Sequence, residues 1–290
     1  MPSFQLQQSR FIAVLSLILA MISISTGASL AKQMFPLIGS EGTSALRTSF
    51  AAIILLSLWR PWRNPPAGRN WHSVIIYGAA LGGINLLFYM SIARIPLGIA
   101  VALEFTGPLA VALFASKRAT DLLWAACAIL GIILLLPLTE TSAPLDGLGI
   151  FYALAAGGCW ALYIISGQKV GTFLPGGTAT ALGMSVAALL VLPVGVATTR
   201  TTLLSWQILP LALGVAILSS ALPYSLEMVA LKRLPAKTFS ILLSLEPALA
   251  SLSGLLFLNE VLSYPQWLGV GLVILASVGS TLSVTDPRIS

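Results

Sequence analysis

The sequence predicts an all-α membrane protein with ten transmembrane helices, arranged as two inverted repeats of five helices each. Three observations carry this prediction: an apolar composition, ten hydrophobic runs of spanning length, and an internal repeat. Of the 290 residues, 57% are hydrophobic and only 8% are charged, and the mean hydropathy is +0.96. Because a soluble domain carries about 25% charged residues, this composition excludes a soluble enzyme, a disordered protein and a nucleic-acid binder.

The hydrophobic runs have the length that a membrane crossing requires, since a helix needs roughly 20 mostly apolar residues to cross a hydrocarbon core of about 30 Å. The connections between them are short and leave no room for a soluble domain. The runs are residues 11–31, 43–59, 73–93, 97–116, 121–138, 147–166, 178–197, 208–230, 238–258 and 265–284.

The distribution of Lys and Arg predicts how the chain is oriented in the bilayer, because cytoplasmic connections are enriched in these residues. Eleven of the 15 basic residues fall on the side of the N-terminus. Only Lys32, Arg94 and Arg200 fall on the other side, and Arg47 lies inside the second run. Both termini are therefore expected to be cytoplasmic.

The two halves of the chain resemble each other at an offset of 139 residues. Arg94-Ile95-Pro96 recurs as Arg233-Leu234-Pro235, and the same offset places Pro108 on Pro247 and Asp121 on Glu260. The third and fourth runs therefore correspond to the eighth and ninth.

The predicted repeats cover residues 1–140 and 145–290. Each has an odd number of helices, so consecutive repeats must lie upside down relative to each other. Inverted repeats are a transporter architecture, with the substrate site near the midplane at the repeat interface. The alternative is a gene duplication in a structural membrane protein.

Two carboxylates lie deep within repeat-equivalent runs, each close to a proline. Glu104 lies in the fourth run before Pro108, and Glu246 directly precedes Pro247 in the ninth. Ionisable groups inside a membrane are costly and mark function by default, and a proline frees a backbone carbonyl. We expect a site for a proton, a cation or a substrate ammonium. The alternative is a carboxyl satisfied by neighbouring hydroxyls, or kept neutral by its apolar surroundings.

Three further ionisable residues each have more than one possible role. Glu227 lies near the cytoplasmic end of the eighth run, where it can serve the site, pair with Lys232 or Arg233, or extend to the interface. Arg47 and Lys32 lie towards the external ends of their runs. Each can anchor a substrate carboxylate or extend to the outer headgroups, and the second reading is slightly favoured for both.

Uncharged polar groups complete the candidate site. Asn85 and Tyr89 are four residues apart in the third run and share one helix face. They can orient a polar substrate or hold helices together. Tyr163 of the sixth run is a further candidate residue. The same run contains Gly157 and Gly158, whose small size is more typical of close helix packing than of a ligand site.

Several chemistries have no motif in the sequence, which lacks a GxxxxGK[ST] loop, a GxSxG elbow and an HExxH pair. The only histidine is His72, and both cysteines, Cys127 and Cys159, lie inside apolar runs. We therefore expect no enzyme activity, no cofactor and no metal. Energy for transport must come from an ion gradient or from the substrate itself.

The chain resembles the drug/metabolite transporter superfamily of the EamA type, and within it the bacterial threonine/homoserine exporters. The resemblance covers nearly the whole chain. It is carried by Thr26–Gly39, Ile95–Phe114, Gly158–Gln168, Ala221–Pro235 and Leu245–Glu260.

The resemblance implies an inner-membrane exporter of threonine, homoserine and related small amino acids, driven by proton antiport. A zwitterion needs a carboxylate for its ammonium and donors for its own carboxylate. Glu104 or Glu246 can supply the first, and Arg47, Lys32, Asn85 or Tyr89 the second. The alternatives are a broader exporter of drugs or metabolites, and an uncoupled channel or scaffold. The sequence leaves open whether the protein forms a homodimer.

Overall fold

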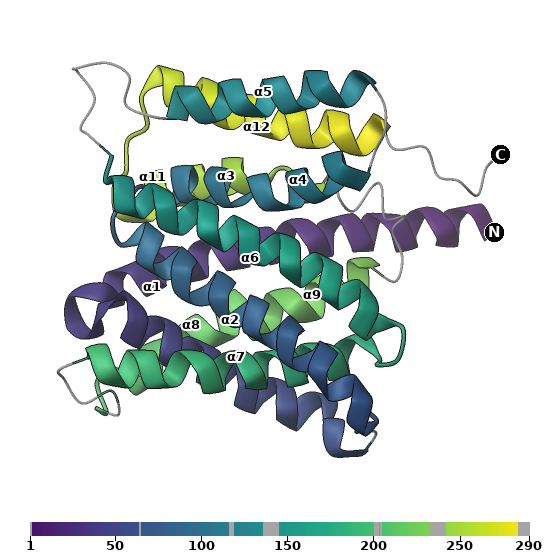
Figure 1. Cartoon of the computed structure of the whole chain (residues 1–290), viewed down its shortest axis with the longest axis vertical. Coiled ribbons are helices and arrows are strands. Elements are labelled where there is room, and N and C mark those ends of the chain that lie inside the picture. Colours follow the sequence, from purple (N-terminus) through teal and green to yellow (C-terminus); the bar gives the residue numbers. More distant parts are fainter. Residues whose placement is uncertain are drawn as a thin grey trace.

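The computed structural model describes residues 2–63, 65–115, 119–135, 145–199, 203, 205–231 and 242–283, and every regular element in these ranges is helical. The helices lie side by side along one common direction (Figure 1). The long ones are α1 (Pro2–Trp59), α2 (Trp71–Ile92), α5 (Ala119–Leu135), α6 (Gly147–Gly171), α7 (Gly176–Thr198) and α12 (Tyr264–Ser283). Shorter ones are α3 (Leu97–Glu104), α4 (Thr106–Ala115), α8 (Leu209–Ala216), α9 (Leu222–Leu231) and α11 (Glu246–Leu258).

All ten predicted runs contain helix within the described ranges. Phe11–Trp59, α2, α6 and α7 are individually long and apolar enough to cross a membrane. The number of ten spans stays a prediction. α1 holds the first two runs, since its only non-helical residue inside is Gly39 (φ 72°, ψ 169°), where the chain turns back. A positive φ at this corner favours glycine, which has no Cβ to clash with the backbone.

The fourth run was expected to be one continuous helix, and it is two. α3 ends at Glu104 and α4 begins at Thr106. The cause is Pro108, which has no N–H and whose ring clashes with the carbonyl four residues earlier, that of Glu104. In the ninth run the helical backbone is likewise interrupted at Ser244 and Leu245, directly before Glu246 and Pro247. The two breaks occupy repeat-equivalent positions.

The eighth run is helical throughout its described part but changes character in the middle. α8 and α9 are joined by η3, a π-helical turn at Ile217–Ala221. Such turns are rare and often occur at functional sites. This one lies against the N-terminal half of α1, where the Ser23 hydroxyl donates to the Leu218 carbonyl at 2.5 Å.

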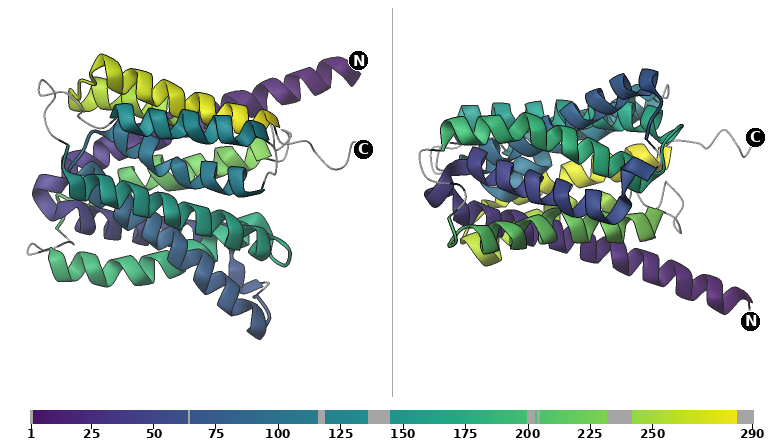
Figure 2. Two further views of the ribbon diagram at one scale, coloured as in Figure 1. Left: turned by 45° about the horizontal axis from the view of Figure 1, so that its top comes forward. Right: turned by 90° about the horizontal axis from the view of Figure 1, so that it is seen from below.

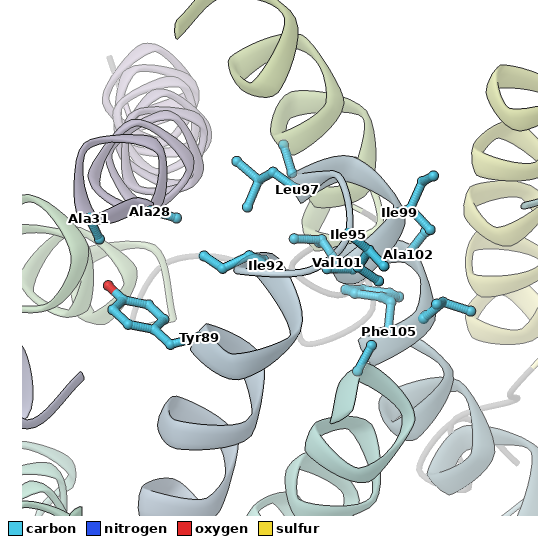
Figure 3. Packing of buried hydrophobic residues seen from close by; sticks show 14 of the residues in the cluster. Ala28, Ala31, Tyr89, Ile92, Ile95, Leu97, Ile99, Val101, Ala102 and Phe105 are labelled. Atoms are coloured by element: carbon cyan, nitrogen blue, oxygen red, sulfur yellow. The ribbon is translucent and has the colours of Figure 1, made fainter. Parts of the chain in front are cut away.

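The helices form layers, with α5 and α12 paired at one edge of the bundle and α7 at the other (Figures 1 and 2). Gly131 of α5 and Gly269 of α12 pack so closely that a Cβ on either would lie within 3 Å of the other's carbonyl oxygen. Small residues allow this close contact where lipid provides no hydrophobic force between helices. The largest buried cluster lies between, around the corner from α2 to α3 (Figure 3).

The break between α3 and α4 is held by the backbone of α6. A Cβ at Gly107 would lie 1.9 Å from the Gly157 carbonyl oxygen, and one at Gly157 would lie 2.6 Å from that of Glu104. The expectation that Gly157 serves close packing is confirmed. Gly158, its neighbour, has nothing within 4 Å of its Cβ position.

Replacing Gly107 by Ala should therefore destabilise the protein by about 1–3 kcal/mol, the usual cost of forcing atoms into a filled space. Gly158→Ala adds the same methyl group to α6 without a clash and is the matched control. Thermal unfolding of both variants in detergent tests this. Equal melting temperatures for the two variants would show that the α6 contact does not hold the break.

Candidate functional site

The guanidinium of Arg47 is the centre of a buried polar cluster, with Arg47 only 7% exposed. Its Nε donates to the Ser219 hydroxyl at 2.6 Å, and its Nη2 donates to the Ser219 carbonyl at 2.9 Å. Its Nη1 donates to the Asn85 side-chain oxygen. The ring of Tyr89 packs against it, with 5.2 Å from the guanidinium carbon to the ring centroid.

The two hydrogen-bond partners of Arg47, Ser219 and Asn85, are themselves held in place by the surrounding helices. Ser219 lies in the π turn η3. Gly27 allows the backbone of α1 to approach this turn closely, because a Cβ at Gly27 would lie 2.8 Å from the Cβ of Ser219. Asn85 is oriented by donating to the Leu81 carbonyl at 2.7 Å. The guanidinium is thus held on two edges by side chains that are themselves fixed.

Part of the hydrogen-bonding capacity of this cluster is unused. A guanidinium has five N–H donors, and three of those of Arg47 have partners in the described part of the chain. The Tyr89 hydroxyl lies near Ser219 and Arg47 but makes no well-formed hydrogen bond to a described residue. It points towards Ala31 of α1 (Figure 3). The free donors of Arg47 suit a ligand carboxylate, which accepts two parallel N–H bonds.

Three carboxylates from three helices lie within electrostatic reach of one another in series, and one of them, Glu104, also reaches Arg47. Glu104, at the end of α3, is buried and within electrostatic reach of both Arg47 and Glu246. Glu246 begins α11 and is half-buried, as is Glu227 of α9, with which it also interacts. Within the described ranges none of the three forms a hydrogen bond or an ion pair through its carboxyl group. Burying a charge without a partner is expensive, so this arrangement favours a cationic ligand or a proton.

The helix breaks give the two nearest carboxylates different surroundings. Glu246 lies in the first turn of α11, where unpaired N–H groups and the helix dipole favour negative charge. Glu104 lies at the C-terminal end of α3, where the dipole favours positive charge nearby. Glu104 is therefore the better position for an ammonium group, and Glu246 is supported by its own helix.

Lys32 lies away from the Arg47 cluster, at the end of the bundle opposite the start of α1. Its ammonium forms an ion pair of 2.5 Å with Glu260. Nearby, Arg94 pairs with Asp146 at 2.6 Å and holds the pKa of that carboxyl below its ordinary value. A cavity of about 510 Å³, lined by Phe35, Glu41, Met90 and Arg94 among others, opens at this end.

Comparison with known proteins identifies the family to which this arrangement belongs. The model of the EamA-like transporter family matches residues 11–136 and 147–282. The chain belongs to this family. The threonine/homoserine exporter RhtA of Escherichia coli K12 is 49% identical over 284 residues, which cover 98% of this chain and 96% of the relative. The protein of the same name in Salmonella typhimurium SL1344 is 48% identical over 290 residues, 100% of this chain and 98% of the relative.

The fold of this chain is similar to that of a protein of known crystal structure that shares only 14% sequence identity with it. Its TM-score is 0.63, and the match covers 92% of this chain and 96% of the other. At this level of identity the similarity concerns the fold alone.

Among the predicted site residues, the structure brings Arg47, Asn85 and Tyr89 together with Glu104 and Glu246. The slightly favoured idea that Arg47 extends to the outer headgroups is wrong, because its guanidinium is buried and bonded within the EamA-like bundle. The physical reason is that the bend at Gly39 folds the second half of α1 into the interior.

Tyr163 and Glu227 are placed less centrally. Tyr163 stacks on Tyr77 of α2, with ring centroids 4.8 Å apart. The Tyr77 hydroxyl donates a hydrogen bond of 3.2 Å to the Tyr163 hydroxyl. This pair lies in a different cluster from Arg47. The predicted partners of Glu227, Lys232 and Arg233, lie outside the described residues.

Two residues important for the site were not predicted from the sequence. Ser219 holds Arg47 through both its hydroxyl and its carbonyl, and no motif marks the π turn that makes this contact. Glu260 was noticed only as the repeat equivalent of Asp121, and its pairing with Lys32 joins residues 228 positions apart. The match between the two repeats drew attention to Glu260, but it did not reveal that Lys32 is its partner.

Proposed function

We propose that this EamA-like protein exports threonine, homoserine and related small amino acids from the cytoplasm in exchange for protons. The observation that carries the proposal is a buried guanidinium, two of whose five donors have no partner among the described residues. It lies within electrostatic reach of Glu104, whose carboxyl group likewise has no hydrogen-bond partner in that part of the chain. These charges are complementary to a zwitterion. Two relatives at 48–49% identity carry the name of such an exporter, which supports the substrate class.

In the proposed site Arg47 binds the substrate carboxylate and Glu104 binds its ammonium. Asn85, Ser219 and Tyr89 hold the guanidinium in place. A proton and an ammonium group compete for the same carboxylate, so Glu104 accommodates one or the other. This competition exchanges a proton for a substrate without a separate ion site. Glu246 and Glu227 are further carboxylates on the way to the cytoplasmic side.

The proposed architecture has ten spans in two inverted repeats, residues 1–140 and 145–290, in the bacterial inner membrane with both termini cytoplasmic. It is supported by the repeat-equivalent breaks and by the position of the chain ends. α1 begins and α12 ends at the same end of the bundle (Figure 1). Lys32, Arg94, Asp146 and Glu260 then lie at the outer end.

The test is uptake of radiolabelled threonine or homoserine by liposomes that contain the purified protein, with an acidic interior. We expect accumulation above equilibrium that collapses when a protonophore removes the pH gradient. An uncoupled channel would equilibrate the amino acid without accumulation. If neither amino acid is transported while other metabolites are, the narrow substrate class fails and a broader exporter takes its place.

A further inference from the structure

The ion pair between Lys32 and Glu260 connects segments that are far apart in the sequence. Its atoms, Nζ of Lys32 and Oε1 of Glu260, are 2.5 Å apart, and the two side chains are only 22% and 14% exposed. Lys32 belongs to α1, in the first predicted repeat. Glu260 follows α11, in the second. Because the pair is largely shielded from water, it is screened far less than an ion pair on the surface.

Both members of the pair also hold the corner between α2 and α3. The second oxygen of Glu260 accepts from the backbone N–H of Leu97 at 2.7 Å, and Lys32 donates to the Ile95 carbonyl at 3.2 Å. Leu97 is the first residue of α3, where N–H groups lack partners within the helix and the dipole favours a carboxylate. Three segments therefore meet at one pair of charges.

The packing directly beneath this contact is tight. One helical turn below Lys32, Ser29 of α1 and Ser253 of α11 are joined by a buried hydrogen bond of 3.2 Å. α3 packs on α11 at Gly98, whose Cβ position would lie 2.0 Å from the Ser251 hydroxyl. Ala31, Ile95 and Leu97 are fully buried around it (Figure 3). α1, α3 and α11 are therefore in close contact directly beneath the ion pair.

The neighbouring ion pair between Arg94 and Asp146 provides a contrast. Its side chains are 43% and 38% exposed, and exposed ion pairs contribute little to stability. Within the described part of the chain, the hydrogen bonds of the Arg94 and Asp146 side chains do not reach α11 or the loop that follows it. It lies beside the closed end and does not hold it.

We propose that the Lys32–Glu260 pair is the latch that closes the outer end of this transporter, and that it must open for the substrate to leave. The inference rests on the alternating access and the orientation proposed above. α3 links the latch to the site, since it begins at Leu97, which the latch holds, and ends at Glu104. The two lie only about 10 Å apart along the helix, at a rise of about 1.5 Å per residue. A change at Glu104 that moves α3 acts directly on the Glu260 contact.

The experiment measures access to the outer end without any substrate. A single reporter, Ser29→Cys, is introduced after Cys127 and Cys159 have been replaced by Ser. Its reaction with a membrane-impermeant maleimide is followed in right-side-out and in inside-out vesicles. With the latch intact the reaction from the outer face should be slow, because Ser29 is 1% exposed.

Glu260→Gln and Lys32→Gln should each speed labelling from the outer face about tenfold, which corresponds to about 1.4 kcal/mol. The double variant should be no faster than either single one, since both remove the same contact. Lys32→Arg keeps the charge and should keep labelling slow. Arg94→Gln, the matched control, breaks the exposed pair and should leave the rate unchanged.

Unchanged labelling in both single variants, in protein that elutes as a monodisperse peak, would overturn the latch. Acceleration from the cytoplasmic face alone would overturn it as well. Because the readout requires no transport, the latch can fail while threonine export is confirmed, and export can fail while the latch is confirmed.

Discussion

Glu104→Gln is expected to reduce proton-driven threonine export by about tenfold to a hundredfold. The amide has nearly the shape of the carboxyl group but neither binds a proton nor attracts an ammonium. Losing a hydrogen bond to a charged group costs about 1.5–3 kcal/mol, which is up to roughly a hundredfold in rate. Initial rates in proteoliposomes at several pH values measure the effect. We expect the remaining transport to be independent of pH.

A control separates this role from a general effect of losing a carboxylate. Glu41 lines the cavity beside Arg94 and accepts a hydrogen bond from Ser40 at 2.9 Å. Glu41→Gln should leave export within about twofold of the original, since surface changes away from a site alter energies by about 0.5 kcal/mol or less. Full export with the original pH dependence in Glu104→Gln would refute the assignment of Glu104.

Arg47→Lys is the second change with a large expected effect, although it keeps the positive charge. A lysine ammonium cannot replace the planar guanidinium that bonds Ser219 twice and Asn85 once. Buried polar groups left without a partner cost about 1–3 kcal/mol each. We expect threonine binding to weaken at least about tenfold and thermal stability to fall. Equilibrium binding and melting temperature in detergent measure the two effects separately.

Tyr89→Phe is the matched control for Arg47→Lys. It keeps the ring beneath the guanidinium and removes a hydroxyl that forms no good hydrogen bond to a described residue. Stability should therefore be unchanged. Normal threonine binding in Arg47→Lys, with only stability lowered, would assign Arg47 a structural role and remove it from the substrate site.

Much of the fold could be predicted from the sequence because spanning helices follow from local composition. Each of the ten runs contains helix in its described part, and Pro108 and Pro247 lie beside two interruptions of the helical backbone. The exact form of these elements could not be predicted. Residues 97–116 read as one uniform apolar segment, and the π turn at Ile217–Ala221 has no composition that sets it apart from an ordinary helix.

The site was only partly predictable, because contacts between distant segments determine what each polar residue does. Glu104 and Glu246 could be found since a charge inside an apolar run is costly wherever it lies. For Arg47, the sequence indicated two environments but could not choose between them, because the choice depends on Ser219, 172 residues away. For Lys32 the sequence indicated the same two environments, and in the structure it instead forms an ion pair with Glu260.

The corner at Gly39 connects the two functional ends of α1. Lys32 lies seven residues before it and Arg47 eight residues after it, so both are about 10–12 Å from the corner along their helices. No flexible loop separates the two arms. A tilt of one arm that frees Lys32 therefore displaces Arg47 on the other, unless the backbone turns at Gly39. Glycine permits that rotation more readily than any other residue, so the mechanical coupling between the Lys32 end and the Arg47 end of α1 depends on this one position.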